Sequence, residues 1–471
     1  TMFRAMEEDA SESSVATPPP KEIKPDELLE KIRSISCQLH LIIFVCSFSW
    51  AVGGISIMSS AFYDFGNSTM ITITEEFELP EKSFLREFSS SSFMIGNVFG
   101  GLISSVIADR IGRRPVMLTC TLGLAVMFIL SSFAPNIYFF IAGRCLHGVF
   151  YTGSGQSSWV LAFECTPTKL RSVTAFLYGI GWVVGYCLVL PIAMLATTWR
   201  EFMLMCSVPV AAFFLVAVLV VPESLYWLVA NGRTEEIQKY WLTKTTEPLL
   251  VPTSNNSMDD GSKRRSILIS YIKTHTIILA YIAAVGLIWL SDAFIYFGLS
   301  MYSTDLAGDY HVNYLFLGLI ELPGYGLAHI ALKRCTRRFV LCSTHMTAAV
   351  AFILLIFLPA GSWVSLMCWM LGKLAITVAY MNIYVMGSEI FPTHLRNSVI
   401  GICGVISRIG GVLAPYVKTL SRISPVFPLI AFCSFAFSAG FIALSLPETK
   451  DRSLDESQSS ESDQSAVEET P

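Results

Sequence analysis

Four charged side chains lie in the middle of long apolar stretches of this sequence, and they are its strongest candidates for chemistry. They are Asp292, Glu321, Lys373 and Arg408. A charge in the hydrocarbon region of a membrane is costly, so a charge at such a position usually has a function. Arg408 could bind a carboxylate through both arms of its guanidinium, or it could form a structural ion pair inside a helix bundle.

Asp292 is the natural counterpart of Arg408, because the two charges are opposite and both lie in apolar segments. They could bind the two ends of a zwitterion together, or they could neutralise each other. Lys373 could be a second contact for a carboxylate. Glu321 stands two residues before Pro323, where it could bind substrate or shape a break in a helix.

Three aromatic residues near Asp292 complete the predicted substrate-binding set. They are Trp289, Tyr296 and Phe297. An organic cation gains free energy from the face of an aromatic ring, which favours a binding function. Helix packing and anchoring at the membrane interface are the alternative, because they account for most aromatic residues in membrane proteins.

The elements that must position these residues are apolar helices. The chain has 471 residues, of which 53% are hydrophobic and 14% are charged, and its mean hydropathy is +0.57. Soluble domains carry about a quarter charged residues, so the composition predicts an all-α membrane protein in contact with the lipid bilayer. Segments of about 20 apolar residues can span a bilayer. Twelve are expected, near 38–61, 88–108, 116–134, 137–157, 173–195, 201–221, 276–301, 313–332, 339–359, 362–387, 397–417 and 425–446.

Other function classes find little support in the sequence. The net charge of −4 does not indicate a nucleic-acid partner. The 12 Cys lack metal-like pairing, and no phosphate-binding loop is present, so we predict neither a cofactor nor a metal nor an enzyme.

Lys and Arg are concentrated in alternate loops, which predicts that these loops and both termini are cytoplasmic. The predicted organisation is a disordered cytoplasmic N-terminus (1–36), a six-helix bundle (37–221), a cytoplasmic linker (222–275), a second six-helix bundle (276–446) and a disordered cytoplasmic tail (447–471). Two such halves form a twelve-helix fold built from inverted repeats.

A motif between the second and third segments suggests a gate at the cytoplasmic side. It runs from Gly101 to Arg114 and contains Asp109, Arg110, Gly112 and Arg113. Gly112 permits a tight turn, and Asp109 at a helix end can pair with a basic group of a neighbouring helix. A basic loop that only sets orientation would also explain the arginines. In the second-half copy, Lys333 replaces the acid and Thr336 replaces the glycine, so gating there is less expected.

Further pairs recur at equivalent places in the two halves, and they extend the predicted gate. Glu164 and Arg171 are echoed by Glu389 and Arg396, while Pro222-Glu223 is echoed by Pro447-Glu448. Arg144 is added to the set. Its structural alternative is a pairing near the gate with Glu164, or a hydrogen bond to a backbone carbonyl.

These motifs together resemble the major facilitator superfamily, and their combination resembles solute carrier family 22, whose members carry organic cations, organic anions and carnitine. The resemblance covers about 38–450. It implies transport of small organic ions by alternating access, with a proton or sodium as a possible coupling ion, in the plasma membrane. The Arg408 position is basic in the family's anion and carnitine carriers, which favours a carboxylate-bearing or zwitterionic substrate.

One departure from the family pattern is large. Family members usually carry a long, Cys-bearing, glycosylated loop after the first helix, whereas 62–87 is short and lacks Cys. A single glycosylation signal remains at Asn67-Ser68-Thr69. A receptor or trafficking protein on a transporter fold, which no longer transports, is therefore the alternative function.

Overall fold

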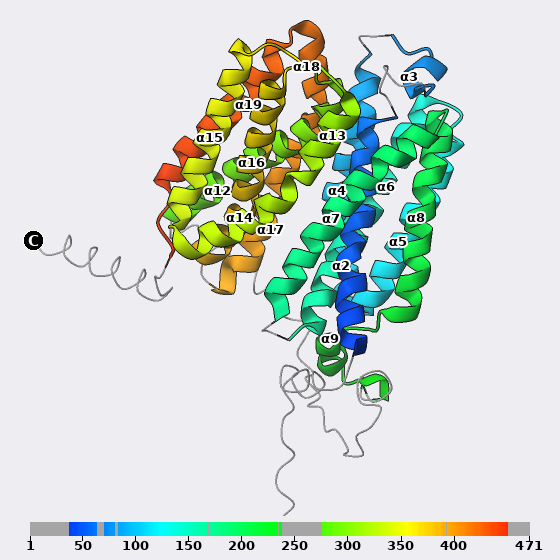
Figure 1. The fold of residues 1–471 in the computed structure, drawn as a ribbon. Helices are drawn as coiled ribbons and strands as arrows, with labels where there is room; N and C mark the ends of the chain where they lie inside the picture. Colours follow the sequence, from blue (N-terminus) through cyan, green and yellow to red (C-terminus); the bar gives the residue numbers. More distant parts are fainter. Residues whose placement is uncertain are drawn as a thin grey trace, which may run out of the picture.

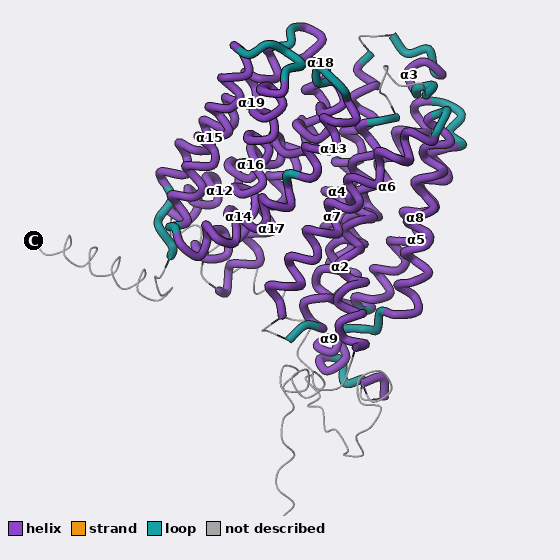
Figure 2. The backbone as a smooth tube through the Cα atoms, viewed as in Figure 1, coloured by secondary structure: helices purple, strands orange, loops and turns teal. Residues whose placement is uncertain are grey.

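The computed structural model describes residues 37–63, 70–80, 83–167, 170–233, 235–237, 276–391 and 393–450. These residues are helical throughout their long segments, and no strand occurs among them, which confirms the all-α prediction. Figure 2 shows that short loops join the helices at the two ends of the molecule. The predicted disordered N-terminus, the tail beyond Lys450, most of the linker and the Asn67 glycosylation signal lie outside the described residues. The first four residues of the predicted tail, 447–450, are described and form hydrogen bonds at the end of the second half.

Two helix bundles stand side by side, with the first half blue to green and the second yellow-green to red in Figure 1. The long helices of the first half are α2 (Cys37–Met58), α4 (Phe84–Ile111), α5 (Arg113–Ser132), α6 (Ile137–Cys165), α7 (Arg171–Leu195) and α8 (Trp199–Val220). Those of the second half are α12 (Thr276–Tyr302), α13 (Tyr310–Leu319), α14 (Glu321–Arg334), α15 (Arg337–Phe357), α16 (Trp363–Ile390), α17 (Thr393–Leu413) and α19 (Val426–Ser445).

Short elements complete the two ends of the bundles. They are η1 (Ser59–Ala61), α3 (Ile73–Glu76), α9 (Leu225–Ala230), η3 (Ser303–Asp305), η4 (Ala414–Tyr416) and α18 (Val417–Ile423). Figure 1 places α3 and α18 at the upper end and α9 at the lower end. We call the lower end, where α4 turns into α5 and α14 turns into α15, the basic end, and the upper end the far end.

In the described part of the chain, 11 spans are long and apolar enough to cross a membrane, so the protein is a multi-pass integral membrane protein. The predicted segment at 137–157 corresponds to α6, which has 29 residues but is more polar than the others. α6 buries Arg144, His147 and Thr152 because it packs against α2, α4 and α5 inside the first half. It can therefore cross the membrane with little contact with lipid.

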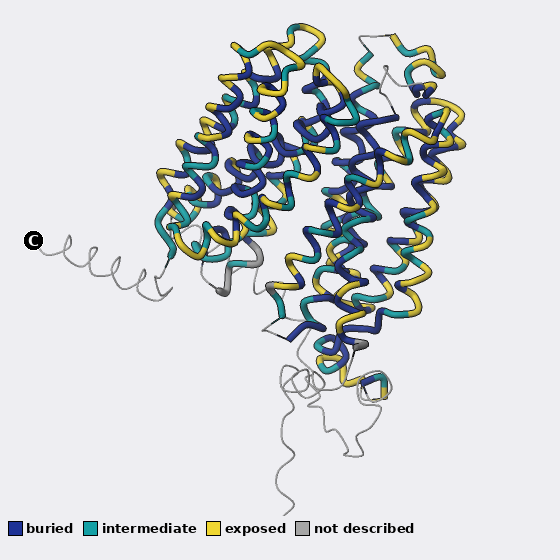
Figure 3. The backbone as a smooth tube through the Cα atoms, viewed as in Figure 1, coloured by how far each residue is buried: buried dark blue, intermediate teal, exposed yellow. Residues whose placement is uncertain are grey.

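Many large apolar residues are exposed on the outer helices, and Figure 3 shows exposed stretches along these helices. Leu219 is 85% exposed and Phe357 is 80% exposed, which would be unfavourable in water but suits a surface in lipid. The interior is packed closely by small residues. A Cβ added to Gly148 on α6 would collide with the backbone of Phe93 on α4, so the two helices touch backbone to backbone.

The eighth predicted segment is broken into α13 and α14 at Ile320. Pro323 lies in the first turn of α14, where its missing N–H costs nothing because no helical partner exists for it. The break places Glu321 at the start of α14 and turns its side chain into the second bundle, where it is fully buried.

Candidate functional site: two networks at the basic end and charges between the halves

A carboxylate holds the turn between α4 and α5 at the basic end of the first half. Gly112 in this turn has φ +108°, and a Cβ there would collide with Glu223, so only glycine fits without strain. The side chain of Glu223 accepts hydrogen bonds from the backbone N–H groups of Arg113 (3.0 Å) and Arg114 (3.2 Å). These N–H groups open α5 and have no partner within the helix, so Glu223 acts as their cap.

Arg113 joins this turn to α6. Its guanidinium pairs with Asp109 one turn earlier (3.0 Å) and with Glu164 at the end of α6 (3.3 Å). Ser224 donates its hydroxyl hydrogen to the same Glu164 carboxylate. Three separate segments of the first half are therefore tied together at one arginine.

The second half builds the same network at the corresponding places. Arg337 makes a two-armed contact with Glu389 (3.1 and 3.2 Å), and Thr449 donates to that carboxylate (2.6 Å). Glu448 accepts from the backbone N–H groups of Arg337 (2.9 Å) and Arg338 (3.0 Å). Although Lys333 and Thr336 replace the acid and the glycine in this copy, the arginine and both glutamates still meet.

Four members of the networks are missing from the predicted gate set: Arg337, Arg338, Ser224 and Thr449. The sequence repeat could have identified all four. Arg337-Arg338 follows α14 just as Arg113-Arg114 follows α4, and each Pro-Glu dipeptide is followed by a residue with a hydroxyl group. Among the predicted members, Arg110 lies exposed on the last turn of α4, Arg171 begins α7 and Arg396 lies in the first turn of α17.

The two capping carboxylates differ in their electrostatics. Burial raises the pKa of Glu223, and its hydrogen bonds from Ser224, Arg114 and Arg113 only partly oppose this. Burial also acts to raise the pKa of Glu448, but the hydrogen bonds from Lys450, Arg337 and Arg338 outweigh it and hold the pKa below its ordinary value.

Arg144 does not belong to the basic end. It lies in the second turn of α6, toward the far end, where it is fully buried. Its guanidinium donates to the backbone carbonyl of Ser56 (3.4 Å) and lies over the ring of Phe93, 4.8 Å from the ring centre. The carbonyl alternative is therefore the observed one, and Glu164 pairs with Arg113 instead, since α6 separates Arg144 from Glu164 by about 30 Å at 1.5 Å per residue.

At the centre of the molecule, Arg408 on α17 reaches across from the second half to the first. Its Nη1 donates to the side-chain oxygen of Asn97 on α4, and Asn97 also accepts from Thr152 on α6. Arg408 is partly exposed, and no carboxylate of the described residues pairs with it. It interacts electrostatically with Tyr151 and Tyr384, which come from opposite halves.

The other central charges are engaged within the second half. The ammonium group of Lys373 pairs with Glu321 (3.0 Å), donates to Ser300 (2.6 Å) and lies 3.4 Å from the ring centre of Tyr296. Tyr296 and Tyr325 both donate to the other oxygen of Glu321 (2.6 and 3.0 Å). Lys373 and Glu321 are both fully buried, so they neutralise each other here.

Asp292 does not meet Arg408. Its carboxylate lies 3.0 Å from Nε2 of His345 on α15, and neither side chain is exposed. The two residues that could have formed one zwitterion site therefore have separate neighbours, because Asp292 faces the interior of the second bundle while Arg408 faces the other half.

The predicted aromatic residues gather near these charges. Phe297 meets the edge of Tyr296, with ring centres 5.2 Å apart, and Trp289 meets Tyr384 at 4.4 Å. Tyr296 also faces Trp182 on α7 across the two halves, at 6.5 Å. Trp182 and Tyr151 line a small pocket, and the indole N–H of Trp182 has no hydrogen-bond partner among the described residues.

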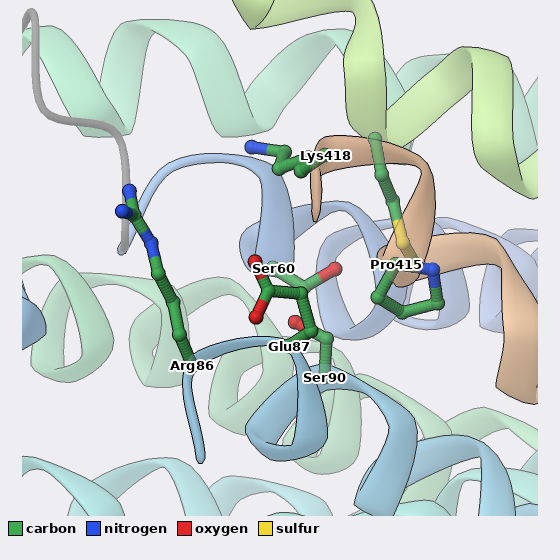
Figure 4. Close-up of a pocket in the computed structure, with 7 residues that line it drawn as sticks. Ser60, Arg86, Glu87, Ser90, Pro415 and Lys418 are labelled. Atoms are coloured by element: carbon green, nitrogen blue, oxygen red, sulfur yellow. The ribbon is translucent and has the colours of Figure 1, made fainter. Parts of the chain in front are cut away.

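Contacts between the halves are strong at the far end. Glu87 on α4 pairs with Arg422 on α18 (2.7 Å), and the rings of Phe84 and Tyr416 stack at 5.9 Å. Ser91 on α4 donates to the backbone of Val412 on α17 (2.8 Å). Figure 4 shows Glu87 pointing toward Ser60 beneath Lys418 and Pro415, which line the same small pocket. The far end is therefore closed by side chains of both halves.

Comparison with known proteins gives a consistent result for the whole membrane region. Residues 43–460 match a family model described as "Sugar (and other) transporter". Solute carrier family 22 member 15 of Xenopus tropicalis is 31% identical over 408 residues, which cover 83% of this chain and 75% of the relative. An organic cation transporter protein of Drosophila melanogaster is 29% identical over 421 residues, which cover 84% and 75%.

Solved structures support the fold. The xylose transporter of E. coli in its inward open conformation superimposes with a TM-score of 0.68 over 89% of this chain and 99% of that chain, at 18% identity. A crystal structure of a D-xylose–proton symporter gives a TM-score of 0.66 over 88% and 100%, at 17% identity. At such identities the likeness speaks for the fold alone.

Proposed function

Because the chain belongs to solute carrier family 22 of the major facilitator superfamily, and so is a membrane transporter, we propose that it carries small organic ions with a carboxylate by alternating access. Zwitterions such as carnitine fall within this class. The names of the relatives described above support an organic substrate. The central charges of this chain support a substrate that carries a carboxylate.

The substrate proposal rests on one observation, the position of Arg408. It is a partly exposed cation between the two halves, and no carboxylate of the described chain neutralises it. Lys373, by contrast, is already paired with Glu321, and Asp292 lies against His345. A substrate carboxylate that replaces Asn97 as the acceptor would gain a charge-assisted, two-armed hydrogen bond.

The aromatic surroundings of Arg408 suit an organic substrate. Tyr151 and Tyr384 contribute ring faces and hydroxyl groups from both halves, and the indole N–H of Trp182 offers a further donor at the nearby pocket. A positively charged end of a zwitterion would be attracted to such ring faces. Substrate would thus contact both halves at once, and this is what lets binding favour an occluded state.

Two features support alternating access. The far end is closed by Glu87–Arg422 and Phe84–Tyr416, which must separate if the centre is to open there. The networks at the basic end tie each half together internally through Arg113 and Arg337, so each half can move as a rigid body. We place the basic end in the cytoplasm of a plasma-membrane protein, since Lys and Arg favour the cytoplasmic side.

The test is uptake of labelled carnitine, tetraethylammonium and succinate by cells expressing the wild type or Arg408→Ala, at matched surface level. Loss of a charge-assisted hydrogen bond costs about 1.5–3 kcal/mol, so uptake of a carboxylate substrate should fall about 10- to 100-fold. Arg334→Ala is the matched control, because Arg334 is an exposed arginine at the end of α14.

Entry of tetraethylammonium alone, unaffected by Arg408→Ala, would contradict the carboxylate proposal and make Arg408 a structural residue. If none of these compounds enters although the protein reaches the surface, the non-transporting receptor or trafficking protein gains support.

A further inference from the structure

A buried histidine and a buried aspartate lie against each other inside the second half, apart from the proposed substrate contact. Nε2 of His345 on α15 is 3.0 Å from Oδ1 of Asp292 on α12, and both side chains are completely buried. Gly440 lets α19 pack closely against α15 at this level, since a Cβ added there would collide with the side chain of Met346 and come within 3.3 Å of the Cβ of His345. Enclosing polar groups this completely costs free energy, so such groups in a membrane-spanning bundle usually have a function.

The hydrogen-bond partners of the ring determine where one proton must be. Nδ1 of His345 lies 2.8 Å from the backbone carbonyl oxygen of Leu341, one turn earlier on α15. A carbonyl oxygen only accepts, so Nδ1 carries a hydrogen. In the neutral ring Nε2 then carries no hydrogen and can only accept. It would face a carboxylate oxygen, which is also only an acceptor. At 3.0 Å the two atoms are close enough to share a second proton, placed on Nε2 or on the carboxylate, and without it two acceptors would face each other.

We propose that Asp292 and His345 together bind one exchangeable proton and that the binding and release of this proton are coupled to substrate transport. The inference rests on the proposed transport function for its second part only. With the proton bound, the pair is neutral overall, either as imidazolium and carboxylate or as imidazole and carboxylic acid. When the proton passes to water, a single negative charge remains in the bundle, and this state is stable only if water reaches it.

Among the described residues around the pair, the other charged groups have partners of their own or lie farther away. On α16, Tyr380 interacts electrostatically with Asp292, and Lys373 is occupied by Glu321. Helix α19 contains no Asp, Glu, Lys or Arg between Val426 and Ser445. Arg337 and Arg338 on α15 lie two turns away at the basic end, in the network with Glu389 and Glu448. Arg408 on α17 does not contact the pair.

Tyr380 lies close to both Asp292 and Arg408, so the pair and the proposed substrate contact are near enough to interact electrostatically. A substrate carboxylate at Arg408 reduces the positive charge there and so favours the protonated, neutral form of the pair. Protonation in turn removes a negative charge that would repel the substrate carboxylate. Each ligand thus favours the binding of the other, as linkage requires.

A metal ion is not an alternative occupant. Two ligands are too few for a protein metal site, and the described residues contain no group of three His, Cys, Asp or Glu side chains able to hold one.

The first experiment needs no substrate. Protein labelled with ¹⁵N-histidine is studied by NMR in lipid nanodiscs, and His345→Gln identifies the signal of His345. We expect a protonated Nδ1 and, near neutral pH, either a second proton on Nε2 or an infrared carbonyl band of a protonated Asp292 that disappears in Asp292→Asn. Absence of both signals overturns the proposal.

The second experiment separates proton coupling from transport itself. Proteoliposomes with carnitine, tetraethylammonium or succinate are tested for exchange at equal pH and for accumulation driven by an imposed pH gradient. Asp292→Asn and His345→Gln should lose gradient-driven accumulation by about tenfold or more, while exchange changes by less than about threefold. The double variant, whose amides can hydrogen-bond without a titrating proton, should behave likewise and guards against misfolding of the single variants.

His329→Gln is the matched control, because His329 is an exposed histidine on α14. Gradient-driven accumulation that survives in the double variant overturns the coupling. Failure of the wild type to exchange any of the three compounds instead overturns the proposed function, and the NMR and infrared result still decides whether the pair holds a proton.

Discussion

The networks at the basic ends of the two halves use the same residue types for the same contacts but differ at two positions. In the first half the turn contains Gly112 at φ +108°, and Asp109 adds a carboxylate to Arg113. In the second half Thr336 occupies the turn at φ −76°, and Lys333 stands where the acid would be. Arg337 compensates by pairing with Glu389 through both arms. The comparison shows that the arginine and the two glutamates are the contacts that both halves share, while the glycine and the aspartate occur in the first half alone.

The largest difference between the halves should appear at the turn itself. Gly112→Ala forces an L-residue into a left-handed conformation, which costs about 1–2 kcal/mol, and its methyl group displaces Glu223 from the first turn of α5. Thr336→Ala is the comparison, because its backbone needs no special freedom and it loses only the hydrogen bond between the Thr336 hydroxyl and Glu448. Thermal unfolding of the purified protein should show a clear loss of stability for Gly112→Ala and little change for Thr336→Ala; equal losses would mean that the two turns are held alike.

Exchange of arginine for lysine should affect the second half more. Arg337→Lys replaces a two-armed contact with a single one, whereas Arg113 makes only one contact with each of its two carboxylates. Since these side chains are partly solvated, we expect a loss of about 1 kcal/mol for Arg337→Lys and less for Arg113→Lys. The same unfolding measurement compares the two variants. A larger loss of stability for Arg113→Lys would show that Asp109 strengthens the first network more than the two-armed contact with Glu389 strengthens the second.

The capping carboxylates should respond differently to neutralisation and to pH. The pKa of Glu448 is below its ordinary value of 4.5, so its stabilising contribution exists above that pH and disappears as the pH falls through the folded-state pKa. The pKa of Glu223 is raised, so its contribution exists below 4.5 and disappears as the pH rises through the folded-state pKa.

Glu448→Gln should therefore lower the unfolding temperature at neutral pH more than Glu223→Gln does. The difference between the two variants should narrow when the measurement is repeated near pH 4. A larger effect of Glu223→Gln at neutral pH would contradict the order of the two pKa values.

The smallest effect on stability is expected at the acid that only the first half has. Asp109 is 73% exposed, so Asp109→Asn should change the free energy of unfolding by less than about 0.5 kcal/mol. Under the proposed mechanism it should still alter transport kinetics, because it removes one of the two partners of Arg113. Lys333→Asp tests the converse by giving Arg337 an acid four residues earlier. Unchanged kinetics in Asp109→Asn at normal surface expression would remove Asp109 from the gate.

The prediction from sequence succeeded where a property depends on neighbours along the chain. Apolar segment lengths located the spans, and Pro323 marked the break between α13 and α14. Repetition between the halves identified Glu164, Glu389, Glu223 and Glu448 as related positions, although their partners Arg337 and Thr449 were not assigned. Arg144 was grouped with the wrong end, although its place near the start of the predicted span 137–157 already set it about 30 Å from Glu164 along one helix.

The amino-acid sequence by itself determined that this protein crosses a membrane repeatedly in two related halves and carries a few charges where lipid would forbid them. Hydrophobic length and charge position are local properties, so no folded contact is needed to read them. Only the tertiary structure decided how those charges are shared. It joined Lys373 to Glu321 and Asp292 to His345, and it left Arg408 between the halves without a carboxylate among the described residues. Which side chains pair depends on the rotation and packing of helices that are far apart in the sequence. A small residue such as Gly440 contributes by letting two helices approach closely.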